Sequence, residues 1–167
     1  MNFFSGARGM KLAFALISAL SIAACSKNPA DLDASAAGAG YATPGSLQDF
    51  AQNVGDRVFF DTDSTELSPT AQATLDKQAR WLNQYGRYAF TVEGHADERG
   101  TREYNFALGA RRAEVTKNYL VARGVSASRI KTISYGKERP VATCDDISCW
   151  SQNRRAVTAL KGAAAGS

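Results

Sequence analysis

The spacing of apolar positions changes several times along the chain, and each spacing predicts a different element. Apolar residues that recur every three or four positions predict helices at 47–54, 69–86 and 102–123. Short runs rich in β-branched and aromatic residues predict strands at 57–60, 88–92, 130–135 and 155–160. The remaining long segments, 93–100 and 136–153, are expected to be loops. This order of strands and helices predicts a small two-layer α/β sandwich.

Residues that favour helix ends stand at the boundaries of the predicted helices. Ser46 can cap the first helix, and Ser68 followed by Pro69 is a strong start signal for the second. Gly86 and Gly124 follow the last periodic positions, where a helix commonly ends. The two longer helices are therefore predicted from both their periodicity and their ends.

The start of the chain has a different pattern. Basic residues precede an apolar run at 12–24, which stops abruptly at Cys25. The run is too short to span a bilayer and fits a secretory signal. Its ending of small residues and cysteine resembles the lipobox of bacterial lipoproteins, so we expect residues 1–24 to be removed and Cys25 to carry lipid. Ser26 resembles the residue found in lipoproteins sent to the outer membrane; the alternative is an ordinary signal peptide with an incidental cysteine.

Composition divides the rest of the chain into three parts. Residues 25–46 are rich in Ala, Gly, Ser and Asp and predict a flexible, lipidated tether. Residues 47–161 hold the predicted elements and form one domain, and residues 162–167 predict a disordered tail. The chain has 44% hydrophobic and 22% charged residues, a composition typical of soluble globular proteins, so we expect that nothing beyond the leader needs to enter lipid. The net charge of +4 favours an anionic polymer or surface without identifying it.

The chain lacks the residues that several kinds of binding and catalysis require. No run of Lys or Arg is interleaved with aromatics, which argues against nucleic acid. The single histidine, His95, is too little for a metal site or a nucleophile relay, so we predict no metal and no cofactor. We interpret His95 as a half-buried residue at a strand end that shapes the following loop. Cys144 and Cys149, a close pair in an oxidising compartment, predict a disulfide.

The predicted helix at 102–123 has a cation in an apolar stripe. Arg112 falls among Tyr104, Leu108, Val115 and Tyr119 by helical spacing. A buried guanidinium needs an anionic or hydrogen-bonding partner, because unpaired burial costs several kcal/mol. The alternative is that Arg112 extends to solvent or pairs with an internal carboxylate. A second apolar face contains Phe106, Ala110, Ala113 and Leu120, so the face that meets the sheet stays open.

Two predicted loops at strand ends supply acidic partners. Asp61 and Asp63 follow one strand, and Asp97 and Glu98 follow the next, beside Arg99. Acids next to a fixed arginine suit a zwitterion, whose ammonium meets the carboxylates and whose carboxylate meets the guanidinium. The alternative is that these are ordinary solvated loop charges.

A family resemblance rests on the same residues. The segment Thr91-Val92-Glu93-Gly94-His95-Ala96-Asp97-Glu98-Arg99-Gly100-Thr101, with Tyr104-Asn105, Leu108 and Arg111-Arg112-Ala113, closely resembles the OmpA-like peptidoglycan-binding domain. The segments 58–61, 134–138 and 153–156 match in the same order. The resemblance implies a βαβαβ(β) domain whose helices pack on one face of a small mixed sheet.

The resemblance also implies a ligand, the diaminopimelate side group of peptidoglycan stem peptides. Asp97 would take its ammonium, Arg112 its carboxylate, and Asp63 would be a second binding position. Further residues on or near the wall of that site would be Thr62, Glu98, Arg99, Asn105 and Leu108. The first loop, at 61–66, and the cysteine loop depart from the commoner family pattern.

The resemblance further implies a lipid-anchored outer-membrane protein whose domain faces the periplasm and which has no reaction to catalyse. Its partners would be peptidoglycan and the Tol system, above all the periplasmic propeller protein of that system, with a role in cell division. The alternatives are an OmpA-like lipoprotein anchor outside the Tol system, a peptidoglycan hydrolase that uses Asp97 or Glu98 as general acid, and a structural domain without a ligand.

Overall fold

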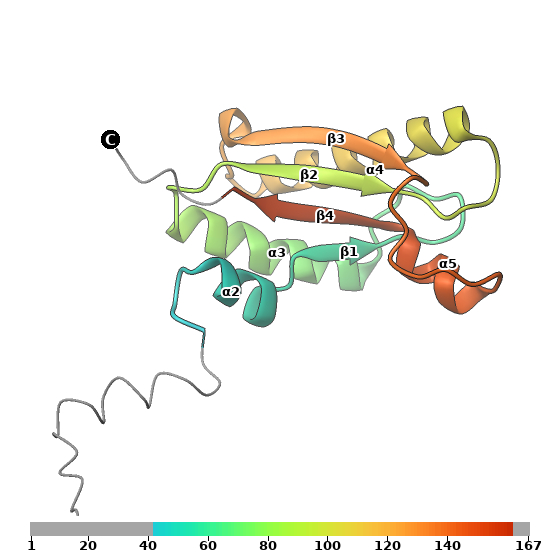
Figure 1. Ribbon diagram of the computed structural model, residues 1–167. Coiled ribbons are helices and arrows are strands. Elements are labelled where there is room, and N and C mark those ends of the chain that lie inside the picture. Colours follow the sequence, from blue (N-terminus) through green and yellow to red (C-terminus); the bar gives the residue numbers. More distant parts are fainter. Residues whose placement is uncertain (1–41, 162–167) are drawn as a thin grey trace, which may run out of the picture. The chain divides into compact units, whose positions relative to one another are not determined.

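A computed structural model describes residues 42–161 of the chain (Figure 1). The predicted signal peptide, Cys25, most of the tether and the predicted tail lie outside the described residues. Within residues 42–161, no helix has the length and apolarity needed to cross a membrane.

The order of elements agrees with the two-layer prediction. A short helix α2 (Leu47–Asp49) continues into a π-helical turn (Phe50–Val54) and is followed by β1 (Arg57–Phe59), α3 (Pro69–Gln84) and β2 (Phe90–His95). Next come α4 (Arg102–Ala122), a 3-10 turn (Ala127–Arg129), β3 (Ile130–Gly136), α5 (Ile147–Asn153) and β4 (Arg155–Leu160). Ser46 and Ser68 cap α2 and α3 through their side chains, as predicted.

The four strands form one mixed sheet in the order β1-β4-β2-β3. Strand β4 runs antiparallel to both of its neighbours, β1 and β2, whereas β2 and β3 are parallel. Strands β1, β2 and β3 therefore run in the same direction, and their carboxyl ends lie at the same edge of the sheet. Figure 1 shows the loops after β1 and β2 meeting there, with α5 close by.

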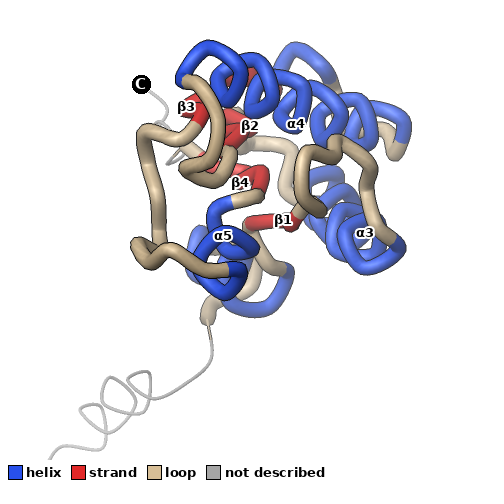
Figure 2. Tube along the Cα trace, turned by 90° about the vertical axis from the view of Figure 1, so that its right-hand side faces the viewer, coloured by secondary structure: helices blue, strands red, loops and turns tan. Residues whose placement is uncertain are grey.

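Helices α3 and α4 cover one face of the sheet (Figure 2). Leu75 and Leu82 of α3 and Leu120 of α4 are completely buried in the core against Phe90 and Val92 of β2. The predicted fold class, with its helices on one face of a small mixed sheet, is confirmed.

Helix α4 crosses β2 at an unusually short distance because both contribute a glycine. A Cβ atom on Gly94 would clash with the main-chain carbonyl of Gly109, and one on Gly109 would clash with the side chain of Ser134. The close approach brings the start of α4 against the carboxyl end of β2, where the loop 96–101 begins.

Strand β2 and helix α5 differ from the sequence prediction. Strand β2 begins at Phe90 rather than Tyr88 and continues through His95, because Glu93 and Gly94 pair with β3 on one side and β4 on the other. The predicted loop 136–153 contains α5, which Asp146 caps by accepting a hydrogen bond from the Ser148 N–H.

The start of the domain also lies earlier than predicted. The main-chain carbonyl of Gly45 accepts hydrogen bonds from the Tyr88 hydroxyl (2.8 Å) and the Arg87 guanidinium (2.6 Å). Ala42 and Gly45 are buried. Residues 42–46, assigned to the tether from composition, therefore pack on the domain.

The buried face of α4 is neither of the two predicted apolar stripes. It combines polar and apolar residues, namely Asn105, Leu108, Gly109, Arg112, Ala113, Thr116 and Leu120. Tyr104 and Phe106, each assigned to an apolar stripe, are 45% and 56% exposed. Hydrophobicity alone could not identify this face because three of its members are polar.

Candidate binding site

A cavity of about 180 Å³ lies between the loops after β1 and β2 and the first half of α4. Its lining consists of Thr62, Asp63, Asp97, Arg99, Gly100, Tyr104, Asn105, Leu108 and Arg112. Seven of the eight residues predicted to bind ligand are among them. The eighth, Glu98, lies outside this lining, and its carboxylate accepts a hydrogen bond from the Trp150 indole.

Two lining residues, Gly100 and Tyr104, were not among the predicted ligand-binding residues. Tyr104 precedes Leu108 by one helical turn, so its position on the cavity side of α4 could have been inferred from spacing. Its hydroxyl donates to the Asp63 carboxylate and so joins α4 to the loop after β1.

Arg112 is completely buried and is held by the main chain. Its Nε donates to the carbonyl of Ser64 (2.9 Å), Nη1 to that of His95 (2.9 Å) and Nη2 to that of Asp61 (3.1 Å). Neither alternative from the sequence is correct, because the guanidinium neither reaches solvent nor hydrogen-bonds a carboxylate. Its partners are carbonyls in the loop after β1 and at the end of β2, which fix its position beside the cavity.

The charge on Arg112 persists despite its burial. Burial, assisted by repulsion from Arg154, lowers the pKa of Arg112 to about 10, while Asp97 and Asp63 act in the opposite direction. The side chain therefore stays cationic at neutral pH. A guanidinium has five N–H groups, of which the three main-chain bonds use three. The other two N–H groups make no hydrogen bond to the described residues.

Asp97 is 7% exposed and is surrounded by donors. Its Oδ1 accepts from the main-chain N–H and the Nε of Arg99, both at 3.2 Å. Its Oδ2 accepts from Nη2 of Arg99 (2.7 Å) and from Nη1 of Arg154 (3.3 Å). Burial raises the pKa of the Asp97 carboxyl, but the hydrogen bonds from Arg99 and Arg154 outweigh it, so the pKa falls below its usual value of 3.8.

Asp97 and Arg112 line the same cavity without bonding to each other. The sequence predicted a site in which the arginine faces the acids, and the structure places both in the lining of one cavity. A carboxylate has about four acceptor positions, and the four donors at Asp97 occupy all of them.

Asp63 supplies the second acid of the cavity in a strained backbone conformation. Its φ of 55° lies in the left-handed region, which is uncommon for residues other than glycine. Asn105 holds the opposite loop, because its side-chain amide donates to the carbonyls of Arg99 (2.6 Å) and Thr101 (3.1 Å). Both loops are thus fixed around the cavity.

Residues 59–154 match the OmpA family. A peptidoglycan-associated lipoprotein of Mesorhizobium japonicum is 66% identical over 154 residues, which cover 89% of this chain and 90% of the relative. The chain belongs to the OmpA family, among its peptidoglycan-associated lipoproteins. A relative of the same description from Pseudomonas aeruginosa is 50% identical over 115 residues and covers 68% of each chain.

Two solved structures share the fold. The crystal structure of the peptidoglycan-associated lipoprotein from Burkholderia pseudomallei superimposes with a TM-score of 0.64 at 37% identity, covering 66% of this chain and 96% of that one. The C-terminal domain of Helicobacter pylori MotB gives a TM-score of 0.61 at 22% identity, covering 65% of this chain and 86% of that one, which shows the fold alone.

In this member of the OmpA family, His95 is buried at the end of β2. It is 2% exposed, and thus more buried than predicted. Its Nδ1 lies 3.4 Å from Nη2 of Arg155, and its Nε2 has no hydrogen-bond partner among the described residues. Burial, followed by repulsion from Arg155 and Arg139, lowers the pKa of His95 to about 4.

Two further features bear on the chemistry available to the chain. Cys144 and Cys149 are joined in a disulfide with a Cα–Cα distance of 5.6 Å. Among residues 42–161, no group of three or more His, Cys, Asp or Glu side chains is placed to hold a metal ion.

Proposed function

We propose that this chain is an outer-membrane lipoprotein that binds peptidoglycan non-covalently through diaminopimelate. Lipid on Cys25 would hold one end, and the domain facing the periplasm would bind the cell wall at the other. As part of the Tol system, with the periplasmic propeller protein as its partner, the chain would link the outer membrane to the wall and support envelope constriction in division. The lipobox-like sequence and the names of the relatives support this proposal.

The observation that carries the proposal is the buried cation in the lining of a cavity that acids also line. The ligand carboxylate would accept hydrogen bonds from the two remaining N–H groups of Arg112. Since main-chain carbonyls already hold the guanidinium, little side-chain entropy is lost on binding. A charge-assisted pair of this kind is stronger than a neutral hydrogen bond.

The ligand ammonium would bind at the acid wall. Asp63 has acceptor positions beyond the one that Tyr104 uses, whereas Asp97 can accept an ammonium only if Arg99 gives up part of its pairing. The Arg99 side chain is 41% exposed, so water can replace part of its pairing when it moves away from Asp97. The ligand ammonium would then take the acceptor positions that Arg99 leaves.

The rest of the lining would fit the body of the ligand. Leu108 provides an apolar wall for the methylene chain between the two ends of diaminopimelate, and Thr62 and Asn105 provide polar groups. A small cavity with both signs of charge would select an amino acid rather than a simple anion.

The ionised state of the Asp97 carboxyl favours a role in binding over one in hydrolysis. A general acid must hold a proton near neutral pH, and enzymes achieve this by raising the pKa of a carboxyl. The pKa of Asp97 is lowered instead, so its carboxyl is ionised at neutral pH. Two arginines beside it stabilise that charge.

Co-sedimentation of the full-length chain with purified sacculi tests the proposal. We expect Asp63→Asn to weaken sedimentation and free diaminopimelate to compete for it. Asn tolerates the left-handed conformation at this position and keeps an acceptor for Tyr104, so the fold should be retained. Asp76→Asn, which removes an acid outside the cavity lining, is the matched control.

Two outcomes separate the competing functions. Released muropeptides would identify a hydrolase and contradict the binding proposal. Capture of the propeller protein by the chain would support the Tol assignment, and its failure alongside intact sacculus binding would indicate an anchor outside that system.

A further inference from the structure

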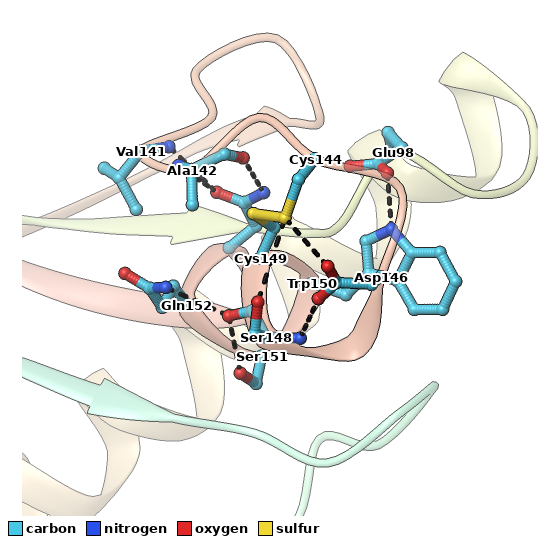
Figure 3. Close-up of a disulfide and its surroundings, with 11 residues drawn as sticks. Glu98, Val141, Ala142, Cys144, Asp146, Ser148, Cys149, Trp150, Ser151 and Gln152 are labelled. Atoms are coloured by element: carbon cyan, nitrogen blue, oxygen red, sulfur yellow. Dashed lines mark hydrogen bonds between the residues drawn. A yellow bond between two sulfur atoms is a disulfide. The ribbon is translucent and has the colours of Figure 1, made fainter.

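Helix α5 is held at both ends by groups outside the helix. It has only seven residues, fewer than an isolated helix needs for stability in water. The disulfide joins Cys149 in its first turns to Cys144 in the preceding loop (Figure 3). At its other end, the Asn153 side chain accepts from Val141 N–H and donates to the Ala142 carbonyl, both at 2.8 Å.

Trp150 projects from this helix toward the loop that carries Asp97. Its indole N–H donates to the Glu98 carboxylate, as Figure 3 shows. The centre of its ring lies 4.1 Å from Cζ of Arg99, a cation–π contact. Trp150 therefore touches both residues that follow Asp97, and one of them, Arg99, is paired with the Asp97 carboxylate.

We propose that Trp150 is a positioning residue for the acid side of the cavity, and that the Cys144–Cys149 disulfide keeps it in place. The inference rests on the proposed function and adds a residue outside the cavity lining on which ligand affinity depends. It acts through Arg99, which must leave part of the Asp97 carboxylate when an ammonium binds there.

The contact explains where Arg99 goes on binding. While it is stacked on Trp150 and next to Glu98, its guanidinium keeps an electrostatic partner after giving up Asp97. Without the indole, Arg99 loses this second partner, so it gives up Asp97 less readily and the ammonium binds less tightly. Cation–π contacts at exposed sites contribute about 0.5–1 kcal/mol, which corresponds to a loss of affinity of about twofold to fivefold.

Reduction of the disulfide should have a similar effect. A dithiol such as dithiothreitol converts the cystine to two cysteine thiols and is itself oxidised to a cyclic disulfide, so two electrons and two protons move to the protein. Cys144 lies in an exposed loop, so a reductant can reach the bridge from that side, whereas Cys149 is buried in α5. The start of α5, and with it Trp150, then loses its covalent restraint.

The first test is a double-mutant cycle in the full-length chain, with affinity for free diaminopimelate as the readout. We expect Trp150→Ala to weaken binding about twofold to fivefold. In a chain that already carries Arg99→Gln, Trp150→Ala should leave the affinity unchanged, because the guanidinium through which Trp150 acts is absent. Trp150→Phe keeps an aromatic face for Arg99 and should restore most of the affinity.

Particular results would overturn the inference. An equal loss from Trp150→Ala with and without Arg99→Gln would show a general structural effect, and no loss in either background would show that Trp150 plays no part. If the unaltered chain does not bind diaminopimelate at all, the proposed function fails, and that result is distinct from either of the others.

The second test addresses the disulfide. Dithiothreitol should weaken diaminopimelate binding by the unaltered chain and shift the NMR signal of the Trp150 indole N–H. The Cys144→Ser, Cys149→Ser double variant should match the reduced chain and show no response to the reductant. Unchanged affinity on reduction, with the two thiols verified by mass spectrometry, would remove the disulfide from the proposal.

Discussion

The buried histidine makes the stability of the fold sensitive to mild acid. His95 is the only histidine of the chain, and its pKa falls from 6.5 to about 4 on folding because burial and nearby arginines disfavour the charged form. The unfolded chain therefore binds more protons than the folded chain between these two values. The stability that the fold gains from keeping His95 neutral is therefore fully present above pH 6.5 and is lost as the pH falls toward 4.

The size of the effect follows from the shift. A change of about 2.5 pKa units at about 1.36 kcal/mol each amounts to about 3 kcal/mol when the pH has fallen below both values. Between pH 7.5 and 5.5 the same relation gives a loss of about 1.3 kcal/mol. Carboxyl groups contribute little in this range, because their ordinary pKa values lie near 4. The loss can therefore be assigned to one side chain.

Urea unfolding followed by circular dichroism at pH 7.5, 6.5 and 5.5 measures the effect. We expect the free energy of unfolding to fall with pH in the unaltered chain and to change little in His95→Gln, which does not titrate. A free energy of unfolding that stays constant or rises as the pH falls in the unaltered chain would refute the reasoning. So would a His95→Gln variant that keeps the full slope.

Three further substitutions test contacts that shape the fold. Gly94→Ala should destabilise the chain by about 2 kcal/mol or more in urea unfolding, because its methyl group meets the Gly109 carbonyl, while Gly86→Ala, which meets nothing within 4 Å, should not. Arg129→Ala should lower the melting temperature by several degrees, since it removes donors to main-chain carbonyls at the end of α3. Asp49→Ala should lower the free energy of unfolding by about 1–3 kcal/mol, because its carboxylate accepts from Trp81, Asn53 and Gly45, and faster hydrogen exchange of the Trp81 indole N–H would report the lost bond.

Local sequence signals predicted most of the fold. The caps at Ser46 and Ser68 and the glycine after α4 act within one turn, so they can be recognised without knowledge of the tertiary structure. Helix α5 could not be recognised in this way, since its seven residues depend on a disulfide and on Asn153 at its far end. The last residues of β2 were missed for a related reason, because pairing on both sides outweighs the low strand preference of Glu93 and Gly94.

The sequence predicted most of the residues of the candidate site but only some of the contacts that they make. The motif around Asp97 and the spacing to Arg112 identified most of the cavity lining. The partners of Arg112 are main-chain carbonyls from the loop after β1 and from the end of β2, which no side-chain pattern encodes. The acceptor positions of the Asp97 carboxylate are all occupied only because Arg154 also donates to it. Arg154 is distant from Asp97 in sequence, and the pairing of strands in the sheet brings the two residues together.

The central claim is that one cavity recognises both charged ends of an amino acid, and calorimetric titration of the full-length chain with three related compounds tests it most directly. Diaminopimelate carries ammonium and carboxylate groups, pimelate lacks the ammonium groups, and 1,5-diaminopentane lacks the carboxylates. We predict that diaminopimelate binds, that neither analogue does so measurably, and that Arg112→Lys abolishes binding while the chain stays folded by circular dichroism. Binding of pimelate or the diamine as tight as that of diaminopimelate would contradict the account.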